Sequence, residues 1–479
     1  MKRVLALTAA LVLAGCTTVG PDYKLPAQAA VNKPTAQAGF QQAHGTAVSS
    51  EALPANWWKL YRSAELDALV EQALTANNSL RAAEAHLHRA VALRAEIDGE
   101  RDPKFGAVAA VKRARESGEA YLLSEQLPVM NEGELAIQAS YQLDLWGQLK
   151  RGEEAAEANV EAVEAAKDVA RVSVVAQTVQ AYLQLCHAQA EKQVATRAIG
   201  LQERTLGLSE RMLSAGRGSS SDVLRAQGQL EAQRASLPRF DAEREGAFYK
   251  LAALLGRTPQ EMPASSVTCA APPQLDHALP VGDGAALLKR RPDLRQAERQ
   301  VAVASARIGV ATAALYPNIS IGASAGLVGI AEHLGQPATQ SFGIGPLIQW
   351  HIPDAGAKAR IKMAEADEQA ALAQFDGVVL HALAETESAL SRYRNDLERQ
   401  GSLRRARDMA AALAAEQKRF VEEGRHPYAS NLDAQRVLIG AESALAAADA
   451  EVAQDQVRVF LSLGGGWEAA PAPTTTSSR

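Results

Sequence analysis

Few side chains of this 479-residue chain are spaced in a way that could support catalysis or bind a metal ion. His86 and His88 lie close together in a helical pattern, and we interpret them as part of a solvated helix face. The sequence contains no HExxH, P-loop or GxSxG pattern. Cys186 lies in a helical stretch and Cys269 in a proline-rich linker, without CxxC spacing, so we expect Cys186 to be a small packing residue. The sequence thus predicts neither an enzyme nor a metal or cofactor site.

The remaining cysteine, Cys16, has the surroundings of a lipid attachment site. The basic pair Lys2-Arg3 precedes an apolar run over residues 4–13 that is too short to span a membrane as a helix. The sequence Leu-Ala-Gly before Cys16 resembles the bacterial lipoprotein cleavage box, so we expect residues 1–15 to be removed and Cys16 to be acylated. An ordinary signal peptide with a chance cysteine is the alternative. Thr17 stands where an aspartate would retain a lipoprotein in the inner membrane, which predicts the outer membrane as the destination.

The composition argues against a nucleic-acid-binding protein. The chain has a formal charge of −5 with 22% charged and 5% aromatic residues, and it has no basic face with interleaved aromatics. Alanine-rich helical stretches with few aromatics favour narrow helix packing over a large aromatic core. Beyond the N-terminus no run reaches 18 apolar residues, so the sequence predicts no transmembrane helix.

Alternation of apolar and polar residues predicts four strands. From Leu135 to Trp146 an apolar side chain occupies almost every second position, and Gln138, Ser140 and Gln142 lie between them. One such stretch alone would fit a half-buried strand of a soluble domain. The pattern recurs, however, and the sequence predicts strands at about 104–113, 134–146, 317–328 and 341–353.

Two long helical hairpins follow the strands. From Gly147 to Ser214 the helical pattern is free of proline, and its length corresponds to roughly 100 Å if it is continuous. Gly216 predicts a turn into a return helix that ends at about Leu255, which gives a hairpin over 147–255. A second hairpin, with its turn at Gly424, is predicted over 354–463.

The arrangement occurs twice, because ordered matches at a nearly constant offset link the two halves of the chain. Gly216, Ala226-Gln227 and Gly256, for example, correspond to Gly424, Ala434-Gln435 and Gly464. The sequence therefore divides into a signal peptide (1–15), an extended N-terminal arm (16–56), a first repeat (57–256), a proline-rich linker (257–283), a second repeat (284–467) and a disordered tail (468–479).

Four strands predict an assembly of several chains. A strand of about 12 residues tilted near 45° rises by roughly 28 Å, close to the apolar band of an outer membrane. Four strands cannot close a barrel, and open edges cannot face lipid because their backbone N–H and C=O groups would lack partners. A homotrimer with twelve strands is the smallest symmetric solution with a lumen wide enough for solutes.

The sequence resembles the TolC/OprM-type outer-membrane efflux proteins, in the lipoprotein branch sometimes called NodT-like. The resemblance covers nearly the whole mature chain and rests on specific motifs: Cys16 to Tyr23, Asn56 to Trp58, Ser140 to Gly147, Leu287 to Glu298, Ile308 to Ala311, Tyr316-Pro317 and Leu463 to Trp467. It implies a mainly α fold with a trimeric 12-stranded membrane β-barrel that is continued by a periplasmic α-helical barrel.

The same resemblance implies a function and partners. The trimer would be a passive exit duct for small toxic compounds, coupled through a periplasmic adaptor protein to an inner-membrane pump of the RND or MFS type. Two alternatives stay open, namely an exit duct for secreted polypeptides and a coiled-coil scaffold lipoprotein without a pore. A scaffold has no need of membrane-length alternating strands, which argues against the last of these.

In this family, acidic residues at the hairpin tips ring the axis and narrow the closed aperture. When the chain is aligned on Gly216 and Gly424, the matching positions are Asp222 and Asp433. Ser430 stands at a further acidic position of the family pattern and His426 at a basic one, so the resemblance implies a closing network that is weaker or built differently. Asp222 could instead only cap the return helix, and Asp433 could be a plain surface group.

Overall fold

The computed structural model describes residues 18–263, 267–269, 271–275, 277–350, 352 and 355–466. The expected signal peptide, Cys16 and the tail from 468 on lie outside these residues. The chain forms two compact units. Unit 1 contains the chain up to Pro26, His86–Glu164 and Gln296–Phe375, and unit 2 contains Ala27–Ala85, Ala165–Arg295 and the chain from Asp376 on. Each unit thus takes segments from both halves of the duplicated sequence.

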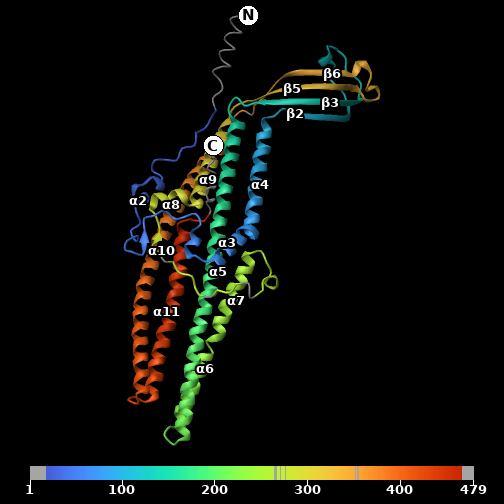
Figure 1. Cartoon of the computed structure of the whole chain (residues 1–479). Helices are drawn as coiled ribbons and strands as arrows, with labels where there is room; N and C mark the ends of the chain where they lie inside the picture. Colours follow the sequence, from blue (N-terminus) through green and yellow to red (C-terminus); the bar gives the residue numbers. More distant parts are fainter. Residues whose placement is uncertain are drawn as a thin grey trace, which may run out of the picture. The chain divides into compact units, whose positions relative to one another are not determined.

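Unit 1 contains a four-stranded antiparallel sheet in the order β2-β3-β5-β6, whose strands lie side by side in Figure 1. The strands are β2 (Lys104–Ala114), β3 (Met130–Leu143), β5 (Asn318–Ile330) and β6 (Gln340–Gln349). Strand β3 ends earlier than the sequence suggested, because Asp144 accepts hydrogen bonds from the backbone N–H groups of Leu149 (3.1 Å) and Lys150 (2.8 Å). The Asp144 carboxylate accepts hydrogen bonds from N–H groups in the first turn of the next helix, which have no partner within that helix. The chain therefore leaves the sheet at Asp144.

The long helices are α5 (Gln148–Ser214), of 67 residues, and α10 (Ala355–Glu422), of 68 residues. Helix α5 is followed by two return helices, α6 (Ser220–Arg234) and α7 (Leu237–Leu254), and α10 by one, α11 (Tyr428–Ser462). The expected single return helix to Leu255 is interrupted because Pro238, in the first turn of α7, has no N–H to donate. Among the described helices, none is long and apolar enough to cross a membrane.

The duplicated glycines have matching backbone conformations. Gly216 and Gly424 end the long helices with φ of 68° and 71°, and Gly256 and Gly464 end the return helices with φ of 67° and 70°. At both tips the hydrogen bonds follow the Schellman pattern, for example from Arg217 N to the Met212 carbonyl (2.8 Å). A left-handed residue at these four places favours glycine, so the repeated glycines specify where each helix ends.

Shorter elements complete the two units. The arm and the linker are more ordered than expected, because β1 (Val48–Ser49) in the arm pairs in parallel with β4 (Leu279–Pro280) in the linker. Trp57 stacks on Phe460 with ring centroids 4.4 Å apart and donates from Nε1 to the Gly465 carbonyl (3.3 Å). The other helices are α2 (Pro34–Gln37), α3 (Ala64–Ala76), α4 (Asn78–Asp98), α8 (Gly284–Arg290) and α9 (Pro292–Ala313), with 3₁₀ turns η1 (Ala30–Asn32), η2 (Trp57–Tyr61), η3 (Gly99–Arg101), η4 (Gly118–Tyr121), η5 (Pro259–Glu261), η7 (Ala331–His333) and η8 (Pro337–Thr339).

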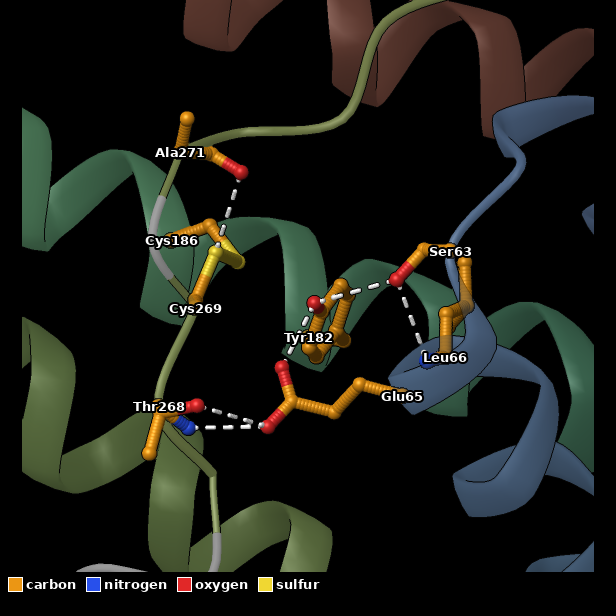
Figure 2. Close-up of a disulfide and its surroundings, with 8 residues drawn as sticks. All are labelled: Ser63, Glu65, Leu66, Tyr182, Cys186, Thr268, Cys269 and Ala271. Carbon is orange, nitrogen blue, oxygen red and sulfur yellow. Dashed lines mark hydrogen bonds between the residues drawn. A yellow bond between two sulfur atoms is a disulfide. The ribbon is translucent and has the colours of Figure 1, made fainter.

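The prediction that Cys186 is only a packing residue was wrong. Cys186 in α5 and Cys269 in the linker form a disulfide in unit 2, with their Cα atoms 5.5 Å apart (Figure 2). Beside it, Glu65 of α3 accepts hydrogen bonds from the Thr268 backbone N–H and from the Tyr182 hydroxyl, both at 2.8 Å. The linker is therefore tied covalently to α5 and by hydrogen bonds to α3.

Candidate functional site

The strand register gives the sheet two chemically different faces. Residues opposite one another in an antiparallel sheet point to the same side. One row across all four strands is Phe105, Ala139, Ala323 and Ile344, and the adjacent row on that side is Ala107, Ile137, Ala325 and Phe342. This apolar face is exposed in the single chain, with Ile137 68% and Phe342 88% accessible.

The opposite face carries polar or small side chains along most of its length. The row at Gln138 continues as Gly106, Ser324 and Gly343, and the next row contains Lys104, Ser140, Gly322 and Gly345. We call it the polar face. Strands β2 and β6 each pair on one side only among the described residues, so the sheet has two open edges. An apolar face, a polar face and two open edges are what a segment of a larger closed sheet requires.

Aromatic residues gather where the sheet meets the helices of unit 1. Trp146 stacks on Tyr316 with ring centroids 4.6 Å apart and donates from Nε1 to the Pro317 carbonyl (3.0 Å). Trp350 donates from Nε1 to the Leu315 carbonyl (3.1 Å). Tryptophan and tyrosine concentrate at the two borders of a membrane, where one part of the ring is in apolar and another in polar surroundings.

A buried arginine fixes the chain just beyond the expected lipid attachment site. Arg151, at the start of α5, is 3% exposed and pairs with Asp22 at 2.8 Å. Its guanidinium also donates to the carbonyl groups of Val19 (3.1 Å) and Gly20 (3.2 Å). The Arg151 guanidinium holds the pKa of the Asp22 carboxyl below its usual value. Cys16 itself lies outside the described residues, but the arm that follows it is held in a defined position on unit 1.

Close backbone contact and a second polar contact add to this arrangement. Gly20 has a φ of +86°, and a Cβ there would lie 2.4 Å from the Gly309 Cα of α9. The Tyr23 hydroxyl donates to the Glu298 carboxylate, and the Arg299 guanidinium lies 5.6 Å from the Tyr23 ring centroid. The Val-Gly-Pro-Asp-Tyr sequence therefore has a structural reason, since its glycine permits the approach and its polar residues hold it.

At the first hairpin tip, Asp222 acts as part of a helix cap. Its carboxylate accepts from the Ser219 backbone N–H (3.2 Å) and hydroxyl (2.7 Å), and Ser219 Oγ accepts from the Asp222 N–H (3.3 Å). This reciprocal pair is a capping box for α6. The Ser219 hydrogen bonds lower the pKa of Asp222 below its usual value, and Arg225 lies 3.1 Å away. The capping role expected as an alternative is present, and it leaves the carboxylate charged.

At the second tip Asp433 and His426 are exposed and Ser430 is half-buried, and the described residues show no hydrogen bond or ion pair among the three side chains. Asp433 accepts from Arg436 at 2.8 Å, and His426 Nδ1 lies 2.8 Å from Gln417 Oε1. Ser430 lies in the first turn of α11, which begins after Pro427. Within one chain, Asp222 pairs with Arg225 and Asp433 with Arg436, each on its own return helix. Any ring of these groups therefore requires further copies of the chain.

Unit 2 also contains a polar cavity of about 550 Å³ among α5, α7, α10 and α11. His187 lines it and is 6% exposed, and burial lowers the pKa of this imidazole to about 4. Nearby, the fully buried Asp455 pairs with Arg458 at 2.6 Å and lies beside the Asp396 carboxyl. Burial and Asp396 raise the pKa of Asp455 to about 6. No group of three His, Cys, Asp or Glu residues suited to a metal ion occurs among the described residues.

Sequence reasoning missed the disulfide, the Arg151 contacts and the buried Asp455. A signal for the disulfide was available, because a chain exported with the expected lipid on Cys16 would retain two cysteines in an oxidising compartment. Arg151 and Asp455 are single charged residues on helices, and their burial depends on contacts with distant parts of the chain.

The comparisons with known proteins agree with this architecture. Residues 69–257 and 285–465 match the family profile described as "Outer membrane efflux protein". The chain is 30% identical to outer membrane protein OprJ of Pseudomonas aeruginosa over 97% of its own length and 96% of that protein, and 26% identical to nodulation protein T of Rhizobium leguminosarum bv. viciae over 100% and 95%.

A solved structure of the outer-membrane channel OprN superposes with a TM-score of 0.84 at 35% identity, covering 94% of this chain and all of that one. The predicted family and fold class are confirmed. The chain therefore belongs to the outer membrane efflux protein family and has the fold and the outer-membrane location of its channels.

Proposed function

We propose that this chain forms, as a homotrimer, the passive exit duct of a tripartite efflux system for drugs or other small toxic compounds. The observation that carries the proposal is the sheet of unit 1, whose apolar face is exposed and whose two edges are open. Three copies would supply twelve strands and pair every edge. The apolar face would then contact lipid, and the polar face would line a solute pathway.

The length of the strands supports this assignment. The four strands have 10 to 14 residues, close to the 9–11 residues that a tilted strand needs to cross a bilayer. Trp146 and Trp350 lie at the helix end of the sheet, where the border between membrane and periplasm is expected. The helical hairpins would continue the duct into the periplasm.

The N-terminal arm supports a lipid anchor at Cys16. Arg151 and Gly309 hold residues 19–22 on unit 1, beside the Trp146 end of the sheet, since the Val19 N–H donates to the Trp146 carbonyl (3.0 Å). An acyl chain on Cys16, three residues earlier, would reach the inner leaflet of the same membrane. The covalent lipid is the only attached group that the proposal includes.

At the hairpin tips, the proposal assigns Asp222 and Asp433 to the periplasmic aperture. Six carboxylates near a threefold axis would attract cations and repel one another. The small residues of the tips would let a periplasmic adaptor protein pack closely; these are Ala215, Gly216, Ser220, Ser221 and Ala429. An inner-membrane pump of the RND or MFS type would supply the energy and most of the selectivity, and the duct itself would perform no catalysis.

The test combines purified protein with a deletion strain. Native mass spectrometry should find three chains, and the protein should conduct ions in planar bilayers. A strain without the gene should become more susceptible to a broad panel of toxic compounds, and the wild-type gene should restore resistance. A stable monomer that does not conduct, or wild-type susceptibility of the deletion strain, would contradict the proposal.

A further inference from the structure

The loop between β2 and β3, residues 115–129, lies over the polar face of the sheet. Together with residues of three strands it borders an open hollow of about 710 Å³. Ala110, Glu134 and Val328 line this hollow and are directly opposite one another in the register, so they form a single row on one side of the sheet. Glu134 and Gln138 are four residues apart on β3, an even number, so their side chains point to the same side. The row therefore lies on the polar face. From the loop, Leu123 and Leu127 complete the wall.

The loop is fixed in this position by ion pairs and by its own backbone. Lys112 Nζ lies 2.9 Å from Glu116 of the loop and 3.0 Å from Glu132 of β3. Across the loop, Arg115 donates to Gln126 at 3.1 Å. The two limbs of the loop cross closely at Gly118, where a Cβ would lie 2.1 Å from the Glu125 carbonyl oxygen. The hollow is therefore formed before any ligand arrives.

The lining combines an apolar wall with excess negative charge. Leu123, Leu127 and Val328, with Met130 and Ile330, supply apolar surface. Three carboxylates, those of Glu116, Glu132 and Glu134, face the hollow against one ammonium, that of Lys112. Lys112 already pairs with Glu116 and Glu132, so Glu134 is the lining carboxylate for which the described residues show no ion pair. A volume of this size and character is typical of a site for a small organic molecule.

We propose that this hollow binds organic monocations with an apolar body. The apolar wall would take the body of the ligand, and the Glu134 carboxylate would face its charge. Neutral or anionic compounds of the same shape would leave Glu134 without a counter-charge and bind more weakly.

The site's position in the duct rests on the proposed function. Strand β2 follows η3 and β3 leads into α5, so the connecting loop lies at the end of the strands away from these helices. If the polar face lines the duct, the hollow is at its outer mouth, and a trimer carries three such sites. A monocation would pause there before it leaves the duct.

Binding to the purified, detergent-solubilised protein tests the site without any pump. The probe is tetraphenylphosphonium, and the neutral comparison compound is triphenylphosphine oxide, both followed by isothermal titration. Glu134→Gln removes a carboxylate that takes no part in the ion pairs of the loop, and it should weaken binding of the cation at least fivefold. Leu127→Trp should fill the hollow and abolish binding. Glu125→Gln is the matched control, because Glu125 is on the same loop and does not line the hollow.

Equal affinity of the cation for the wild type, Glu134→Gln and Leu127→Trp, or no binding at all, would overturn the proposal, as would equal affinity for the neutral compound. Single-channel recording separates this result from a failure of the duct. If the protein conducts and the cation does not block the current from either side of the bilayer, the duct proposal stands and the position of the site at its mouth is wrong. If the protein does not conduct, the duct proposal fails and the titrations still decide whether the hollow binds the cation.

Discussion

Ile137 and Gln138 are neighbours at the middle of β3 that point to opposite faces of the sheet, and arginine at each position should have opposite consequences. Ile137 is opposite Ala107 and Ala325 on the apolar face, and Gln138 is opposite Gly106 and Ser324 on the polar face. In the proposed trimer, Ile137→Arg places a charge against lipid. Gln138→Arg places the same charge in water, among small residues that leave room for it.

The expected cost follows from the depth of Ile137. Arginine on the lipid face of a membrane barrel costs about 2–4 kcal/mol at the bilayer midplane and almost nothing near the interfaces. A trimer carries three copies, which gives roughly 6–12 kcal/mol if the distant sites are additive. That is comparable with the whole stability of an ordinary folded protein, about 5–15 kcal/mol, so Ile137→Arg should prevent stable assembly.

The assay is the fraction of trimer recovered from outer membranes, measured by native mass spectrometry, with conductance of any recovered trimer in planar bilayers. Ile137→Arg should give little or no trimer. Gln138→Arg should give wild-type amounts and a channel that is less selective for cations, because a positive charge then lines the pathway. Equal recovery of the two variants, or loss of trimer in Gln138→Arg alone, would refute the assignment of the two faces.

Three further changes test other parts of the molecule. Replacing Cys186 and Cys269 with serine opens a crosslink between residues 83 positions apart, which should cost about 4.5 kcal/mol by loop entropy and make thermal unfolding of the variant insensitive to reductant. Asp433→Ala should raise the leak current and reduce the cation selectivity of reconstituted channels. Unchanged conductance and selectivity would show that the assignment of Asp433 to the periplasmic aperture is wrong. Because the folded pKa of Asp455 is raised to about 6, its protonated form stabilises the fold below about pH 4 and this stabilisation is lost as pH rises through 6. Asp455→Asn should therefore flatten the decline of the melting temperature between pH 4 and 7, and parallel profiles would contradict the pKa shift.

Much of the fold was readable from the sequence because local patterns specify it. The strand predicted around Leu135 has one apolar face, and only this face can contact an apolar environment, whichever strands lie beside it. Gly216 and Gly424 end their helices for a reason within a few residues, since the left-handed conformation favours glycine. These predictions required no knowledge of distant contacts.

The features that were missed depend on residues far apart in the sequence. Whether Cys186 meets Cys269 depends on where the linker crosses α5, and no local pattern encodes that crossing. The burial of Arg151 depends on an arm more than a hundred residues away. The role of Asp144 could have been predicted from the local sequence, because a carboxylate just before a long helix is a recognisable cap signal. That signal would have placed the end of β3 correctly.

The differences between the two duplicated hairpins limit how the periplasmic end of the proposed trimer can open. Three chains with two hairpins each give six hairpins, but the two kinds differ in their tips and return helices. The first tip is held by the Ser219–Asp222 capping box, and its return helix is interrupted before Pro238. The second tip begins its return helix after Pro427, and α11 is continuous for 35 residues. Hairpins with different caps and different continuity have different resistance to bending. Opening of the periplasmic end should therefore follow threefold rather than sixfold symmetry, with one kind of hairpin moving more than the other.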